Sequence, residues 1–94
     1  RIKENKNKKI TITLKKEQFP DKKYSLLEIS DNAGGISKEN ADKIFEPYFT
    51  TKHKSQGTGL GLFMSKMIIE KSLDGELIHE NIKNGSLFTI KLVL

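Results

Sequence analysis

Two adjacent glycines follow an acidic residue, Asp31, in a stretch whose residue types suit the binding of a polar ligand. Leu27, Ile29 and Asp31 have the same parity along a predicted strand, so the carboxylate points to the same side as two apolar side chains. A carboxylate in an apolar layer is costly unless it accepts hydrogen bonds, and the exocyclic amine of a purine, with water alongside, is a suitable donor. Asp31 is therefore a candidate ligand-binding residue, the alternative being a turn aspartate that caps its own loop.

An aromatic cluster comes next, in the stretch from Ile44 to Lys52 that reads Ile-Phe-Glu-Pro-Tyr-Phe-Thr-Thr-Lys. Its rings precede a polar segment that contains lysine and glycine, an order that suits an anchored hinge before a mobile lid. The same rings also suit a small satellite of the core. Lys52 and Lys54 are candidate phosphate contacts, although a solvated lysine is the more common role.

A glycine-rich run from Gly57 to Leu62 opens an amphipathic segment. Glycines let the backbone approach a ligand closely, and the N–H groups at a helix start attract phosphate. The dinucleotide-binding fingerprint needs a glycine where Leu62 stands, and the Walker pattern needs Gly-Lys-Ser/Thr, which does not occur in the chain. The run therefore indicates phosphate binding outside these two folds.

The elements that position these residues follow from the apolar periodicity and from turn residues such as Pro20 and the pair Asn84–Gly85. Ser37 is the expected N-cap of the first helix. The predicted strands cover residues 9–16, 24–30, 76–82 and 87–94, and the predicted helices cover residues 38–44 and 58–72. This order predicts an α/β fold, a two-layer α/β sandwich with one mixed sheet and helices on one face.

The composition fits one small globular domain, with 31% charged and 35% hydrophobic residues in 94. The absence of cysteine excludes disulfides and thiolate metal sites. The net charge of +5 is concentrated in residues 1–23, which hold nine Lys/Arg and three Asp/Glu. A basic nucleic-acid binder is thus a competing class, but the single arginine gives base recognition little support.

In their order, these features resemble the catalytic domain of sensor histidine kinases, within the GHKL (Bergerat) ATPase superfamily that includes gyrase B, MutL and the heat-shock chaperone ATPases. Residues 31–35 resemble its first glycine box, residues 45–49 its F box and residues 57–62 its second glycine box. The resemblance covers residues 9–94. It implies a Bergerat-type fold for a partial ATP-binding catalytic domain over residues 1–94, with residues 1–8 as a polar lead-in and residues 50–57 as the ATP lid.

The resemblance also implies the ligand, which is ATP, and a role for each site residue. Asp31 would bind the adenine amino group, Gly35 would admit the purine and Ile36 would line its pocket, while Phe45 and Phe49 would anchor the lid. The cofactor-binding residues that it implies are Asp31, Gly35, Ile36, Lys52, Gly57, Thr58, Gly59, Leu60, Gly61, Leu62 and Ser86.

The implied activity is ATP-dependent phosphorylation of a histidine on a separate dimerisation domain, followed by relay to a response regulator, on the cytoplasmic side of a soluble or inner-membrane parent. Ala33 departs from the family pattern, where glycine is usual, and its methyl group is tolerated if its φ is negative. Neither His53, in the predicted lid, nor His79, in a predicted strand, is expected to be the phosphoacceptor.

A larger departure concerns the asparagine-bearing helix of the family, which supplies the Mg²⁺ ligand and should precede the first strand. Asn5 and Asn7 lie in a lysine-rich stub without apolar periodicity, so we expect a domain truncated at its N-terminus. The 94 residues alone should then hold no catalytic residue or metal ligand, be inactive, and self-associate through an uncovered apolar sheet face. The alternative function is a non-catalytic, anti-sigma-like regulatory module of the same superfamily.

Overall fold

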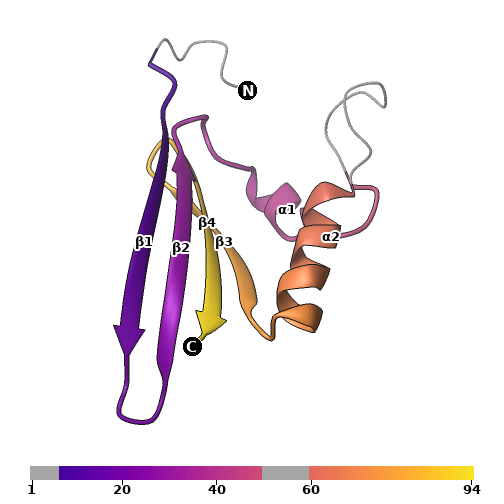
Figure 1. Ribbon diagram of the computed structural model, residues 1–94. Helices are drawn as coiled ribbons and strands as arrows, with labels where there is room; N and C mark the ends of the chain where they lie inside the picture. Colours follow the sequence, from indigo (N-terminus) through magenta and orange to yellow (C-terminus); the bar gives the residue numbers. More distant parts are fainter. Residues whose placement is uncertain (1–6, 50–59) are drawn as a thin grey trace.

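The computed structural model describes residues 7–49 and 60–94 of the chain. These residues form the predicted order of elements, with the helical segment between the two hairpins in the chain. In space the two hairpins lie together and the helices lie beside them (Figure 1). The elements are β1 (Ile10–Gln18), β2 (Lys23–Asp31), α1 (Lys38–Ala41), α2 (Gly61–Met67), the π-helical turn η2 (Ile68–Ser72), β3 (Glu76–Ile82) and β4 (Gly85–Val93).

The four strands form one sheet in the order β1-β2-β4-β3, and every neighbouring pair is antiparallel. The prediction of a mixed sheet is therefore wrong. β2 and β3 run in the same direction on either side of the helical crossover, but β4 lies between them and separates them. Hydropathy shows which side of a strand is buried but carries no information on which strand becomes its neighbour.

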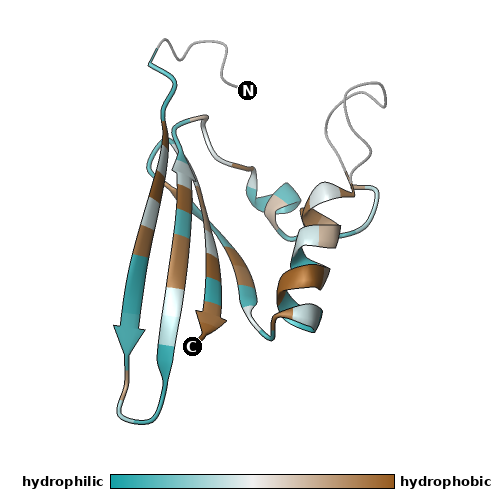
Figure 2. Ribbon diagram, in the orientation of Figure 1, coloured by the Kyte–Doolittle hydropathy of each residue, from teal (hydrophilic) through white to brown (hydrophobic). Residues whose placement is uncertain are grey.

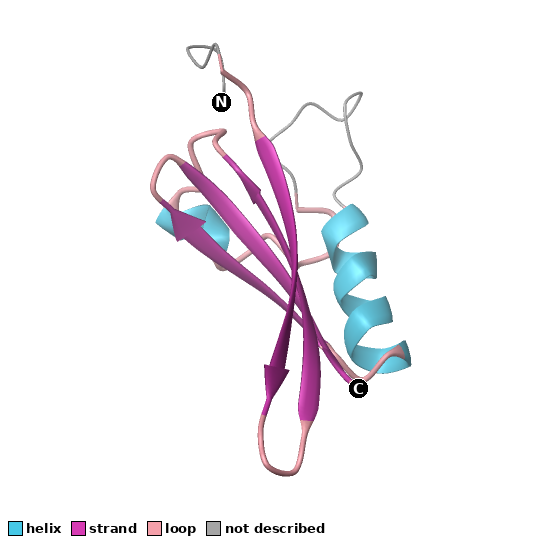
Figure 3. Cartoon of the chain, turned by 60° about the vertical axis from the view of Figure 1, so that its left-hand side comes forward, coloured by secondary structure: helices cyan, strands magenta, loops and turns pink. Residues whose placement is uncertain are grey.

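The helical segment lies on one face of the sheet, as predicted, with α2 and η2 against β3. Strand register places Leu27 opposite Ile90 and Ile90 opposite Leu77, so these apolar side chains share a face. Phe45, which follows α1, packs its ring against Phe88 on that same face. Figure 3 shows α2 alongside the twisted strands, and Figure 2 shows apolar bands alternating with polar ones along β1 and β2.

α1 ends at Ala41, before the predicted end at residue 44. Its predicted cap is confirmed, because the Ser37 hydroxyl accepts a hydrogen bond from the backbone N–H of Asn40 at 3.3 Å. Beyond the helix the backbone continues in three-residue turns, such as the bond from the Lys43 N–H to the Asn40 carbonyl at 2.8 Å. Pro47 has no N–H to continue a helix and disfavours helical geometry at the residue before it, so the tighter turns precede it.

The second helix begins at Gly61 in the described part of the chain, while its predicted start near Thr58 lies outside the described residues. Its predicted end near Ser72 is confirmed. The last turn is π-helical, and the N–H of Leu73 closes it by donating to the Ile68 carbonyl at 3.2 Å. None of the described helices is long and apolar enough to cross a membrane.

β1 carries an apolar stripe that the helices do not cover. Ile10, Ile12 and Leu14 are 72%, 67% and 70% exposed as whole residues, because α2 and η2 lie against β3 at the far side of the sheet. The buried apolar residues in the described part of the chain are Leu26, Ile44, Ile69 and Leu77. Leu77 lies on the face that bears the helices, and Ile44 and Ile69 belong to the helical segment, whereas Leu26 has the opposite parity to Leu27 and is buried on the other face. The face of β1 that bears its apolar stripe remains open.

Candidate functional site

Three segments of the candidate site lie at one end of the molecule. The end of β2, the β3–β4 turn and the start of α2 all lie at the upper end in Figures 1 and 3, whereas the β1–β2 loop lies at the opposite end. Asp31, Ser86 and Gly61 belong to these three segments. The fold therefore brings the first glycine box and the start of the long helix to the same end.

Asp31 is half-buried at the end of β2, on the face that the helices cover, as its parity predicted. Its Oδ1 accepts a hydrogen bond from the N–H of Ala33 at 2.9 Å, so the alternative of a turn aspartate that caps its own loop is correct for this oxygen. The same oxygen lies 3.4 Å from the N–H of Ser86, which donates to it from β4. The carboxylate therefore ties the loop to the neighbouring strand.

Ser86 is fully buried, and its hydroxyl oxygen has no hydrogen-bond partner among the described residues. A buried hydroxyl without a partner costs about 1–3 kcal/mol, so such groups are normally satisfied by a water or a ligand. The backbone of Ser86 is bonded to Asp31, which places this hydroxyl beside the candidate carboxylate. The two residues thus fit a polar ligand with a hydrogen-bonding edge.

The glycine loop needs glycine for conformational reasons. Gly34 and Gly35 have φ values of 92° and 75°, in the region that other residues rarely adopt. Ala33 is not among the described residues with positive φ, so its methyl group is compatible with the loop. A Cβ on Gly35 would lie 2.8 Å from Oδ1 of Asn81 and 3.0 Å from the Gly85 carbonyl oxygen, so protein rather than open space faces it.

Two residues that the sequence did not single out for the site support this loop from the β3–β4 hairpin. Asn81 binds the backbone of Ile36 twice, accepting from its N–H at 2.9 Å and donating to its carbonyl at 2.7 Å. Gly85 packs against the Asp31 carbonyl so closely that a Cβ would overlap it. Asn84–Gly85 had a turn signature in the sequence, but Asn81 lies 45 residues from Ile36 and had no local signal.

The start of α2 has neither a capping side chain nor an acidic one among the described residues. Leu60 occupies the N-cap position without a side-chain hydrogen bond, and the first turn contains no acidic residue. A Cβ on Gly61 would meet nothing within 4 Å, so packing within the described residues does not require glycine there. Leu62 is half-buried in the first turn. The remaining second-glycine-box and lid candidates, which are Lys52, Gly57, Thr58 and Gly59, lie outside the described residues.

Within the F box, Phe45 is the ring that packs on the sheet. It meets Phe88 edge to face, with centroids 6.4 Å apart, while Lys66 of α2 places its Nζ 4.8 Å from the Phe45 ring centroid. Tyr48, in contrast, is 73% exposed and has a positive φ of 66°. Phe45 therefore joins the turn after α1 to both α2 and β4.

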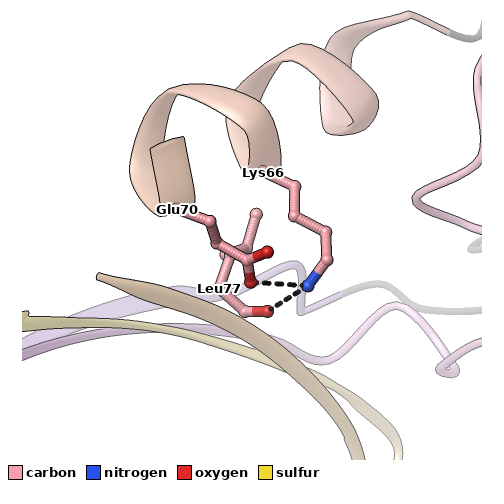
Figure 4. A network of polar contacts seen from close by, with 3 residues as sticks. All are labelled: Lys66, Glu70 and Leu77. Carbon is pink, nitrogen blue, oxygen red and sulfur yellow. Dashed lines mark hydrogen bonds and ion pairs between the residues drawn. The ribbon is translucent and has the colours of Figure 1, made fainter. Parts of the chain in front are cut away.

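Lys66 also forms a polar network with α2 and β3, shown in Figure 4. Its Nζ lies 2.8 Å from the Glu70 carboxylate and donates to the Leu77 carbonyl at 3.3 Å. The hydrogen bond from Lys66 lowers the pKa of Glu70 below its ordinary value. The network borders a groove of about 320 Å³ between the turn after α1 and α2.

Metal-binding residues do not gather in residues 7–49 and 60–94, where no group of three or more His, Cys, Asp or Glu could hold an ion. His79 lies in β3 with its ring against Phe88, at a centroid distance of 4.9 Å, and His53 lies outside the described residues.

Comparison with protein families gives one match over nearly the whole chain. Residues 2–94 match the family described as histidine kinase-, DNA gyrase B-, and HSP90-like ATPase. The chain is 43% identical over 68 residues to the two-component sensor PprA of Pseudomonas aeruginosa, covering 72% of this chain and 7% of that protein. It is 40% identical over 76 residues to the sensor kinase CckA of Brucella abortus, covering 81% of this chain and 8% of that protein.

Solved structures agree with this match. The catalytic domain of the histidine kinase ThkA superposes with a TM-score of 0.69 at 32% identity, covering 89% of this chain and 53% of that one. The mycobacterial sensor histidine kinase MprB, at 24% identity, shares the fold with a TM-score of 0.65, covering 87% of this chain and 55% of that one. The resemblance to catalytic domains of sensor histidine kinases is thus confirmed.

Proposed function

The chain belongs to the family of histidine kinase-, DNA gyrase B- and HSP90-like ATPases, and we propose that its residues 31–36, 57–62 and 86 bind ATP. The observation that supports this most directly is the buried, unpartnered hydroxyl of Ser86 beside Asp31. In this proposal residues 1–94 are part of an ATP-binding catalytic domain, residues 1–8 are its lead-in and residues 50–57 are its ATP lid.

At the base end, Asp31 accepts a hydrogen bond from the exocyclic amine of adenine. The hydroxyl of Ser86 bonds to the base or to a water that bridges to it, which would satisfy the buried oxygen. Gly35 and Ile36 line the base, on a loop that Asn81 holds. Because guanine has a carbonyl where adenine has the amine, this arrangement selects adenine.

At the phosphate end, the backbone N–H groups of Leu60, Gly61 and Leu62 face the phosphates, since a helix start carries partial positive charge and this one has no acidic residue in its first turn. In this proposal Gly57, Thr58 and Gly59 also bind the phosphates, and Lys52, in the lid, contributes a positive charge to them. ATP supplies the γ-phosphoryl group, and Mg²⁺ accompanies it, held mainly by the phosphates and by residues outside the described ranges.

The chain spans only 7% of the length of PprA and 8% of the length of CckA. We propose that the parent is a two-component sensor histidine kinase on the cytoplasmic side. The γ-phosphoryl group then passes to a histidine on a dimerisation domain of the same protein, and from there to a response regulator. Assayed alone, the 94 residues should bind ATP weakly and transfer no phosphoryl group, since positioning and metal clamping dominate this chemistry.

An NMR titration tests the nucleotide site, because it detects weak binding. Adding ADP to the ¹⁵N-labelled chain should shift the amide signals of residues 31–36, 60–62 and 86. Asp31→Asn keeps an oxygen that can accept from Ala33 and Ser86 but removes the charge, so it should lower ADP affinity about tenfold or more while the fold persists.

Asp21→Asn is the matched control, since it removes the same charge from an exposed position in the β1–β2 loop, at the opposite end of the sheet. It should leave ADP affinity unchanged. GDP should bind more weakly than ADP to the wild-type chain. Equal affinities for ADP and GDP, or equal effects of the two substitutions, would show that Asp31 does not read the base.

A further inference from the structure

The loop that follows Asp31 has no helix or strand over residues 32–37, yet it must keep a defined shape if it lines a ligand. Its glycines at 34 and 35 have positive φ and contribute no side chains to hold it. Hydrogen bonds from other elements must therefore supply the order. The residues before β1 hold Asn32, whose side chain accepts from the N–H of Lys9 at 2.9 Å and donates to the Asn7 carbonyl. The β3–β4 hairpin holds the glycines, since the Asn84 carbonyl accepts from the N–H of Gly34 at 3.0 Å.

Asn81 supplies two further bonds from the same hairpin, both from one side-chain amide. Its oxygen accepts from the N–H of Ile36 and its nitrogen donates to the carbonyl of the same residue, at 2.9 Å and 2.7 Å. An amide is the neutral side-chain group that offers an acceptor and a donor side by side, so it can satisfy both backbone groups of one residue as a neighbouring strand would. Ile36 is thus held in position and in orientation.

Asn81 and Gly35 also fit one another. The missing Cβ of Gly35 would lie 2.8 Å from the Asn81 oxygen, so the amide occupies the space that a side chain at position 35 would need. The same hairpin reaches Asp31 through the N–H of Ser86 at 3.4 Å. One hairpin therefore holds both the carboxylate and the loop next to it, and fixes their separation.

We propose that Asn81 is a positioning residue for the adenine site. The inference rests on the proposed function. Asn81 acts through Ile36 and Gly35 and does not touch the nucleotide, and its contribution concerns the base rather than the phosphates, because the start of α2 belongs to a different element.

The test combines a measurement of the loop with a measurement of binding, both by NMR on the 94-residue chain. In Asn81→Ala, hydrogen exchange of the Ile36 amide should become about fivefold to tenfold faster, as expected when its N–H loses a hydrogen bond that is only partly shielded from solvent. ADP affinity should fall on the order of fivefold, while affinity for inorganic triphosphate, which has no base, should not change.

Asn81→Asp is a second variant of nearly the same shape. It keeps an acceptor for the Ile36 N–H but sets a carboxylate oxygen against the Ile36 carbonyl, so it should also weaken ADP binding and leave triphosphate binding unchanged. Asn40→Ala is the control, since the Asn40 side chain, on α1, makes no hydrogen bond within the described residues. It should alter neither the exchange of Ile36 nor the affinity for either ligand.

Three results would overturn the inference. Faster exchange of Ile36 with ADP affinity unchanged would make Asn81 a support for the loop alone, and equal losses for ADP and triphosphate would indicate general destabilisation. Unchanged exchange of Ile36 would show that the two bonds do not hold the loop. A fourth result concerns the wild-type chain: if ADP shifts none of its amide signals, the adenine site itself is refuted, and with it the role of Asn81. That result is distinguishable from the other three because it appears before any substitution is made.

Discussion

Gly85→Ala should displace the Asp31 carboxylate, because the added methyl group pushes against the Asp31 backbone. Gly85 opens β4 and lies against the backbone of Asp31, so that a Cβ would lie 2.7 Å from the Asp31 carbonyl carbon and overlap its oxygen. Carbon atoms in contact prefer about 3.5–4.0 Å, so the two backbones must separate by roughly 1 Å. Both sides of the contact are main chain, and no side-chain rotation can relieve it.

The cost follows from this geometry. Overpacking a well-filled site costs about 1–3 kcal/mol, and a domain of this size loses about 4–8 °C of melting temperature per kcal/mol. Gly85→Ala should therefore lower the midpoint by roughly 5–20 °C in thermal unfolding followed by circular dichroism. The amide signals of Asp31 and Asn32 should move even at low temperature, and ADP binding should weaken because the carboxylate has shifted.

Gly61→Ala is the matched control for stability. The added Cβ meets nothing within 4 Å in the part of the chain that the structure describes. Alanine favours a helix over glycine by about 0.5–1 kcal/mol, so this variant should melt at or above the wild-type temperature. If Gly85→Ala melts within about 2 °C of the wild type with unchanged Asp31 signals, the close approach of β4 to the site is wrong.

Three further predictions concern other parts of the molecule. Lys66→Met should raise the pKa of Glu70 toward its ordinary value in a ¹³C NMR titration, and an unchanged pKa would refute the ion pair. Because the pKa of Glu70 is lowered in the folded state, its ionised form stabilises the fold above the unfolded-state pKa. That contribution is lost as the pH falls through the folded-state pKa. Ser86→Ala removes a buried hydroxyl without a described partner, so it should leave the melting temperature equal or higher while weakening ADP binding; a large loss of stability would mean that the hydroxyl is already bonded. Ile12→Lys places a charge on the open apolar stripe of β1 and should abolish concentration-dependent self-association in sedimentation velocity, whereas a wild-type chain that stays monomeric at high concentration would show that the stripe tolerates water.

The sequence predicted the local structure well, because local signals are strong in this chain. Ser37 is an N-cap as expected, the apolar spacing up to Ser72 marks a helix, and the parity of Asp31 places it on the face where the helices lie. The packing is looser than that spacing predicted, because Met64, Met67 and Ile68 are 53%, 46% and 52% exposed. Each of these signals lies within a few residues of the feature that it predicts.

Long-range features could not be read in the same way. The prediction of a mixed sheet was wrong because β4 lies between β2 and β3. Apolar periodicity contains no information on strand order. Asn81 looked like an ordinary polar residue at the end of a strand, and only the fold brings it to Ile36. The glycine at 35 was expected to admit a purine, whereas the structure shows that positive φ and the Asn81 amide already require it.

A crystal structure of the 94-residue chain with bound ADP is the most direct test of the nucleotide site. We expect the exocyclic amine of adenine within hydrogen-bond distance of the Asp31 carboxylate and the Ser86 hydroxyl bonded to the base or to a bridging water. The phosphates should lie at the start of α2. Adenine bound elsewhere, or bound with its amine turned away from Asp31, would contradict the proposed nucleotide site.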